Sequence, residues 1–142
     1  MYKIWLNMKK ILLILIIFII SFITTACDNK ESYILFNKYP FSEKTMAETT
    51  NVFSPGDRIY YLITTPKPVE TNKLLVQVYK LGSNERLGYE LMWGKMVKIR
   101  NEQVYYYTDY FTLNQTGAYV MNVYSKDYPT KMLTTNNFYI RN

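Results

Sequence analysis

From Ser32 onward, apolar and polar residues alternate with a period of two, and residues that favour turns separate the alternating stretches. Because successive side chains of a strand point to opposite faces, this alternation predicts half-buried strands. No window shows the sustained spacing of three and four residues that an amphipathic helix needs. The pattern therefore predicts an all-β domain with strands at Tyr33–Asn37, Arg58–Thr64, Lys73–Leu81, Gly88–Trp93, Met96–Arg100, Val104–Leu113, Ala118–Ser125 and Leu133–Ile140.

The segments between these strands are suited to turns because each contains Gly, Pro, Asn or Asp. They are Ser54–Asp57, Pro66–Pro68, Gly82–Asn84, Asn101–Glu102, Asn114–Gly117 and Lys126–Pro129. Seven or eight short strands at this spacing are typical of a sandwich of two antiparallel sheets. A small β-barrel is the alternative that the same pattern allows.

Two segments resemble parts of immunoglobulin-like and fibronectin type III domains. Pro55–Ile63 is similar to the turn and second strand of an immunoglobulin-like sandwich, and Leu113–Val123 resembles the tyrosine corner. The resemblance implies that Tyr119 buries its ring at the start of the penultimate strand, beside Leu113, while its hydroxyl bonds to the backbone of the preceding loop. It implies an immunoglobulin-like sandwich, here without a disulfide because Cys27 is the sole cysteine.

The N-terminus has the three-part layout of a secretory signal. A basic start at Met8, Lys9 and Lys10 precedes an apolar run over 11–23, and small residues follow. The run is about 13 residues long, short of the roughly 20 that a spanning helix needs. Met8 is an alternative to Met1 as the true start of the chain.

The four residues Thr24, Thr25, Ala26 and Cys27 resemble the lipobox of bacterial lipoproteins, with Thr24 standing where Leu, Val or Ile is commoner. The resemblance implies that Cys27 is the lipid attachment site, acylated and freed by cleavage before it. Several acyl chains anchor a protein stably, whereas one binds marginally. Ordinary cleavage after Ala26 and an uncleaved signal anchor are the alternatives. We therefore expect a signal peptide at 1–26, a lipidated cysteine and short tether at 27–32, and one β-sandwich domain at 33–142.

The composition excludes several classes of function. The chain has no histidine and one cysteine, which excludes zinc sites built on Cys and His, Ser-His-Asp triads and Cys-His pairs. Three of the 17 basic residues precede Cys27, so 14 basic and 11 acidic residues follow it, without a cluster typical of a nucleic-acid binder. No stretch has the ligand spacing of a calcium loop or a glycine-rich phosphate loop. We expect no metal, no cofactor and no nucleic-acid partner.

Paired carboxylates can carry hydrolysis without histidine. Glu85, Glu90, Glu102 and Asp109 fall in one region of the sequence, but no spacing fixes a separation between any two of them. We therefore expect no catalytic residues and no enzyme activity. A carboxylate enzyme using Glu90 and Asp109 remains an alternative.

Tyrosine is unusually frequent, at 15 residues. If Phe111 and Leu113 face the core, alternation turns the tyrosines at even positions of the same strand outward. Counting in the same way from Ile59 and from Val123 turns the tyrosine that follows each of them outward. The outward tyrosines predicted in this way are Tyr60, Tyr106, Tyr110 and Tyr124. Exposed tyrosines are favoured at recognition surfaces, so we expect one sheet face to bind a partner. The plain alternative is that tyrosine is a good strand former.

Together these features predict a non-catalytic binding or accessory module, anchored by lipid to a bacterial cell membrane or envelope and facing the periplasm or the exterior. Its expected partners are the membrane, through the lipid, and an unidentified envelope or extracellular protein. The alternative function is that of an envelope protease inhibitor. Its inhibitory loops would be those at 42–54 and 66–72.

Overall fold

The computed structural model describes residues 31–142 except 67–68, 70–71, 83–87, 104 and 128. The expected signal peptide and Cys27 therefore lie outside the described residues. The elements are β1 (Tyr33–Asn37), η1 (Met46–Glu48), β2 (Val52–Phe53), β3 (Arg58–Thr64), β4 (Lys73–Leu81), β5 (Tyr89–Lys98), η2 (Asn101–Gln103), β6 (Tyr106–Thr112), β7 (Gly117–Ser125) and β8 (Met132–Ile140). Within the described part of the chain, no helix is long and apolar enough to cross a bilayer.

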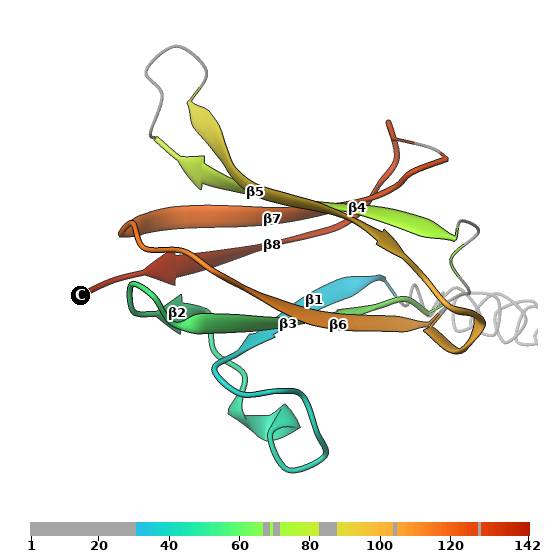
Figure 1. The fold of residues 1–142 in the computed structure, drawn as a ribbon, viewed down its shortest axis with the longest axis horizontal. Helices are drawn as coiled ribbons and strands as arrows, with labels where there is room; N and C mark the ends of the chain where they lie inside the picture. Colours follow the sequence, from blue (N-terminus) through green and yellow to red (C-terminus); the bar gives the residue numbers. More distant parts are fainter. Residues whose placement is uncertain (1–30, 67–68, 70–71, 83–87, 104, 128) are drawn as a thin grey trace, which may run out of the picture.

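The strands form two sheets that pack face to face (Figure 1). A three-stranded sheet has the order β1-β3-β6, and a five-stranded sheet has the order β2-β8-β7-β4-β5. All pairs are antiparallel except the two-residue pair of β2 and β8. If β2 is counted as a continuation of β1, the sandwich has seven strands. Strands one, two and five (β1, β3 and β6) form one sheet, and strands three, four, six and seven (β4, β5, β7 and β8) form the other. Strands one, two and five likewise oppose strands three, six and seven in immunoglobulin-like domains. The predicted all-β sandwich is confirmed.

Three strands, β1, β3 and β4, begin and end where the alternation predicts. The prediction of two strands at Gly88–Trp93 and Met96–Arg100 is wrong, because β5 runs unbroken through both and pairs with β4 along its whole length. Gly94 lies inside this strand, opposite Gln77, and does not turn the chain. The short strand β2 carries too few residues to show a period in the sequence.

A layer of aromatic rings joins the two sheets. Phe138 of β8 lies at its centre, with its ring centroid 5.0 Å from Phe36, 5.7 Å from Phe111 and 5.2 Å from Tyr119. Trp93 of β5 stacks on Phe111 at 5.0 Å. These contacts span both sheets, so the core is one continuous cluster.

The two open edges of the sandwich are each bridged by a polar contact. Along one edge, Lys95 of β5 donates a hydrogen bond to the carboxylate of Asp109 on β6. Along the other, the side-chain amide of Asn136 on β8 donates to the carbonyl of Ile34 on β1 at 2.7 Å. Inward-pointing charges on edge strands also oppose pairing with another chain.

Tyr119 has the geometry of a tyrosine corner. The residue is fully buried, and its ring stacks on Phe138 with an interplanar angle of 10°. Its hydroxyl donates to the backbone carbonyl of Gln115, four residues upstream, at 2.6 Å. Leu113, the neighbour implied by the resemblance, is buried in the same core. The bond ties the turn between β6 and β7 to the core.

We expect Tyr119→Phe to lower the free energy of unfolding by about 1 kcal/mol, because the Gln115 carbonyl loses its buried partner. Denaturant unfolding of the two proteins measures the difference. Tyr39→Phe is the control, since Tyr39 is exposed in the loop after β1. Equal stability of the Tyr119→Phe and Tyr39→Phe proteins would contradict the corner.

Candidate functional site

Three of the four predicted outward tyrosines share the outer face of the three-stranded sheet. Tyr60 of β3 pairs directly with Tyr110 of β6, and their ring centroids lie 5.4 Å apart. Tyr106 begins β6 on the same face, opposite Thr64. Tyr106 and Tyr110 are each 47% exposed. The sheet therefore presents a row of aromatic rings to the outside.

This outer face carries almost no charge. Arg58 is its one charged residue, and its guanidinium lies 5.3 Å from the ring centroid of Tyr110. We call the face the tyrosine face, and its other outward positions are Tyr33, Leu35, Asn37, Tyr60, Leu62, Thr64, Tyr106, Thr108, Tyr110 and Thr112. The loop after β1 covers one corner, where the Asn37 amide donates to the carbonyl of Thr45 at 2.7 Å.

Tyr124 does not join the tyrosine face. It faces outward as predicted, but it belongs to β7 of the five-stranded sheet, on the opposite side of the sandwich. There it lines a shallow hollow of about 230 Å³ with Tyr79 and Tyr89. Alternation along one strand gives the direction of a side chain but not the sheet in which that strand lies. The expectation that all four tyrosines share one surface is therefore wrong.

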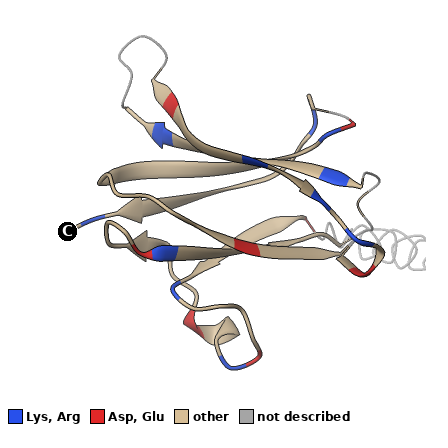
Figure 2. Ribbon diagram, viewed as in Figure 1, with Lys and Arg blue, Asp and Glu red and all other residues tan. Residues whose placement is uncertain are grey.

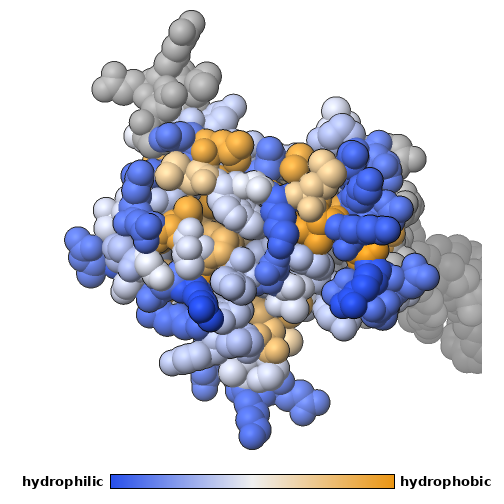
Figure 3. Space-filling model, viewed as in Figure 1, coloured by the Kyte–Doolittle hydropathy of each residue, from blue (hydrophilic) through white to orange (hydrophobic). Residues whose placement is uncertain are grey.

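The outer face of the five-stranded sheet is a second exposed apolar surface, which the sequence did not predict. Five of its large side chains are between 42% and 52% exposed, namely Leu81, Tyr89, Leu91, Met96 and Met132. We call it the five-stranded face, with outward positions Leu75, Gln77, Tyr79, Leu81, Tyr89, Leu91, Gly94, Met96, Ala118, Val120, Asn122, Tyr124, Met132, Thr135, Asn137 and Tyr139. In Figure 3, apolar side chains reach the surface along the upper edge, where this sheet lies.

A β-bulge in β5 explains why the alternation of the sequence does not predict this face. Val78 pairs with Trp93, whereas the next residue, Tyr79, pairs with Leu91, so Met92 is an extra residue in β5. Strict alternation from the inward-facing Trp93 would turn Leu91 inward. The extra residue reverses the alternation, and Leu91 points outward instead.

The carboxylates named in the sequence lie on different elements. Asp109 lies in β6, and Glu90 lies exposed near the start of β5 in the other sheet. Glu102 is paired with Arg100 at 3.2 Å, and Glu85 lies outside the described residues. Among the residues that the structure describes, no three Cys, Asp or Glu side chains could together hold a metal ion.

Asp109 is instead a structural anion. Its burial opposes ionisation, but hydrogen bonds from Lys95, from the backbone N–H of Tyr110 and from the Tyr107 hydroxyl outweigh that effect and lower its pKa. The Tyr107 hydroxyl donates to the carboxylate at 3.1 Å. Burial, followed by the charge of Asp109 and its hydrogen bond, raises the pKa of Tyr107 to about 12. All these contacts hold the edge between β5 and β6 closed.

The two loops expected for a protease inhibitor lie at opposite ends of the sandwich. The end of β1 pairs with the start of β3 at Asn37 and Tyr60, so the loop at 42–54 leaves from that end. The loop at 66–72 follows the other end of β3, beyond Thr64. The two loops therefore leave the sandwich from different ends, and the inhibitor alternative stays a prediction.

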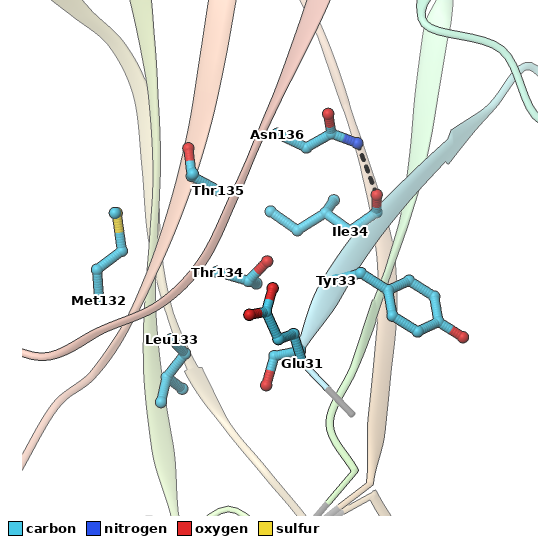
Figure 4. A pocket seen from close by; sticks show the side chains of 9 residues that line it. Glu31, Tyr33, Ile34, Met132, Leu133, Thr134, Thr135 and Asn136 are labelled. Carbon is cyan, nitrogen blue, oxygen red and sulfur yellow. Dashed lines mark hydrogen bonds between the residues drawn. The ribbon is translucent and has the colours of Figure 1, made fainter. Parts of the chain in front are cut away.

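A hollow of about 650 Å³ lies where the chain enters the domain, between β1 and β8 (Figure 4). Glu31, Tyr33 and Met132 line it, together with Thr134 and Thr135. It is open and holds one carboxylate and no basic side chain. None of the predicted binding tyrosines lines it.

No family model and no curated protein matches this sequence. Among solved structures, the chain is similar to a superoxide reductase (neelaredoxin) variant, T24K, from Ignicoccus hospitalis, with 11% identity, a TM-score of 0.45 and coverage of 83% of this chain and 86% of that chain. It is also similar to the PmoD soluble domain from Methylocystis, with 11% identity, a TM-score of 0.46 and coverage of 78% and 90%. The CARDB domain of a Pyrococcus furiosus protein is similar with 12% identity, a TM-score of 0.42 and coverage of 78% of this chain and 86% of that chain. Likeness at this level carries no information on function.

We expect the stability of the domain to fall as the pH drops below about 4, close to the pKa of an aspartate in an unfolded chain. The pKa of Asp109 is lowered in the folded state, so the unfolded state takes up the proton first, and the stabilisation is complete only above that range. Asp109→Asn should remove this pH dependence and lower the free energy of unfolding at pH 7 by about 1 kcal/mol, because Lys95 and the Tyr107 hydroxyl would lose their negatively charged partner.

Chemical unfolding between pH 3 and pH 7 measures the effect. Asp127→Asn, in the exposed turn between β7 and β8, is the matched control and should retain the pH dependence of the unmodified protein. Identical pH profiles for Asp109→Asn and Asp127→Asn would show that Asp109 does not stabilise the edge.

Proposed function

We propose that this chain is a binding module without catalytic activity, anchored by lipid to a bacterial cell envelope. The observation that carries the proposal is the tyrosine face, an exposed sheet surface with rings at Tyr60, Tyr106 and Tyr110 and with Arg58 as its sole charge. Tyrosine and arginine are enriched among the residues that dominate binding energy at protein interfaces. Rigid rings with polar tips bury large areas at a low entropic cost.

The expected partner is an envelope or extracellular protein. A surface that lacks lysine and acidic side chains over the outward positions of three strands has little electrostatic attraction for nucleic acid. A protein partner can cover the rings and leave Arg58 at the rim. The absence of histidine from the chain and the separation of Glu90 from Asp109 support a role in binding rather than in catalysis.

The anchoring part of the proposal rests on the sequence that precedes the domain. Cys27 lies six residues before Tyr33, the first residue of β1. Six residues span at most about 20 Å when fully extended. A lipid at Cys27 would therefore hold the end of the sandwich at which β1 begins close to the membrane, with the tyrosine face directed sideways.

Cys27→Ser should abolish incorporation of labelled fatty acid, because the thiol is the acylated atom. The chain should then accumulate as an uncut precursor or lose its partition into detergent. Labelling in the producing bacterium followed by phase separation measures both effects. Normal lipid labelling of the Cys27→Ser protein would refute the anchor and leave the proposed binding surface untouched.

Replacing Tyr106 with a photoreactive amino acid should give a covalent adduct with one partner in the producing cells. The same substitution at Tyr39, an exposed tyrosine outside the tyrosine face, should give none. Adding Tyr60→Ala and Tyr110→Ala to the Tyr106 probe should lower the yield at least tenfold, since truncating two hot-spot residues costs more than about 1.4 kcal/mol. Equal yields from the Tyr106 and Tyr39 probes would exclude the face as the binding site.

A further inference from the structure

The five-stranded face is free of charge over a large area. The pairing register places Lys73 and Lys98 on the same outward side as these sixteen positions, and those two lysines are the only charged side chains among the outward positions of the four long strands. Depletion of charge with exposed methionine, leucine and tyrosine is typical of the centre of a protein interface.

The charges at the anchored end of this sheet mark a boundary. Lys73 and Lys98 pair with each other at the end where β4 begins and β5 ends, and the outward positions beyond them are uncharged. Figure 2 shows most of the coloured residues toward the ends and loops of the sandwich, apart from one blue band midway along β5 and one red band midway along β6. The sheet therefore has a charged margin and an uncharged interior, which is the layout of an interface core with a polar rim.

Four polar residues of the face are hydrogen-bonded to one another in pairs. The Tyr79 hydroxyl donates to Oε1 of Gln77 at 3.0 Å, and the Thr135 hydroxyl donates to Oδ1 of Asn122 at 2.8 Å. A side chain that already has a partner loses less when water is removed. A partner can therefore cover these four polar side chains at a small cost in free energy.

From this face we infer that the chain forms a homodimer, in which the five-stranded faces of two copies pack against each other. Its four long strands lie about 4.8 Å apart and extend about 30 Å, a footprint of about 600 Å² per copy. Two such footprints exceed the roughly 1,000 Å² of total buried surface that a specific interface needs. Homodimer interfaces are also larger and more apolar than transient ones. The five-stranded face is larger than the tyrosine face and exposes leucine and methionine side chains, so it fits a homodimer better.

The direction of the two-fold axis follows from the anchor, so this step rests on the proposed function. β1 begins at one end of the sandwich, so a lipid at Cys27 would hold that end of the strands at the membrane. Two copies on one membrane meet with their anchored ends on the same side only if the two-fold axis runs along the strands. The interface is then isologous, with each face contacting the same face of its partner. Confinement to one membrane raises the effective concentration and favours the pairing.

The mass of the full-length chain purified in detergent tests the homodimer. We expect two copies for the unmodified protein, and one copy for Val120→Lys and for Leu91→Lys, because each places a charge in the apolar interface. Leu91 is 52% exposed, so lysine there is compatible with folding, and melting verifies both variants. Thr108→Lys adds the same charge to the tyrosine face and should remain a dimer.

A single-copy mass for the unmodified chain at 100 µM, or a two-copy mass for both variants of the five-stranded face, would overturn the homodimer. Detergent partition of the same samples reports the anchor separately. A dimer that stays out of the detergent phase would refute the anchor and leave the interface standing. A monomer that enters the detergent phase would refute the interface and leave the anchor standing.

Cross-linking in membranes tests the axis. Leu75 and Tyr124 pair with each other across β4 and β7, away from the middle of the face and toward the end where β4 begins. An axis along the strands brings each of these positions close to its own copy, whereas an axis across the strands separates them, so Leu75→Cys or Tyr124→Cys should give a disulfide-linked species of twice the mass on oxidation, and Thr108→Cys should give none. Failure of both cysteines to cross-link would overturn the axis along the strands.

Discussion

The burial of Phe138 between the two sheets is the constraint on which the rest of the structure depends. Its ring contacts aromatic side chains from β1, β6 and β7, and it also meets Phe53 of β2 at 6.2 Å. A packed layer of this kind permits one register for each strand, because a shift of one residue would expose the whole inward set. Once the inward set is determined, the outer faces and their side chains are determined as well.

The two edges of the sandwich are held by polar contacts of unequal character. The Lys95 and Asp109 pair brings two charges together on inward-pointing positions, with Tyr107 as a third partner. The Asn136 amide instead reaches a backbone carbonyl that β1 would otherwise leave unpaired at the edge of its sheet. The first contact pairs the half-exposed Lys95 with a mostly buried carboxylate, which would be costly to leave without a partner. The two contacts leave the two outer faces as the large surfaces open to partners.

Those two faces differ in size and chemistry, and this difference separates the proposed roles. The tyrosine face spans three strands and combines aromatic rings with one arginine. The five-stranded face is broader, mainly aliphatic in its exposed side chains, and uncharged except for Lys73 and Lys98 at one end. A membrane anchor at the end of the strands would leave both faces accessible from the side. One module could thus pair with a second copy through one face and bind a different protein through the other.

The sequence by itself determined the β class, the bounds of β1, β3 and β4, and the outward direction of the four tyrosines, because alternation and turn residues are local properties. It also determined the absence of histidine and of a disulfide within the domain. Only the tertiary structure decided that Tyr124 lies on a different face from Tyr60, and that a bulge at Met92 turns Leu91 outward. Sheet membership and bulges depend on pairing between strands distant in sequence, and a period read along one strand contains no information on its partner.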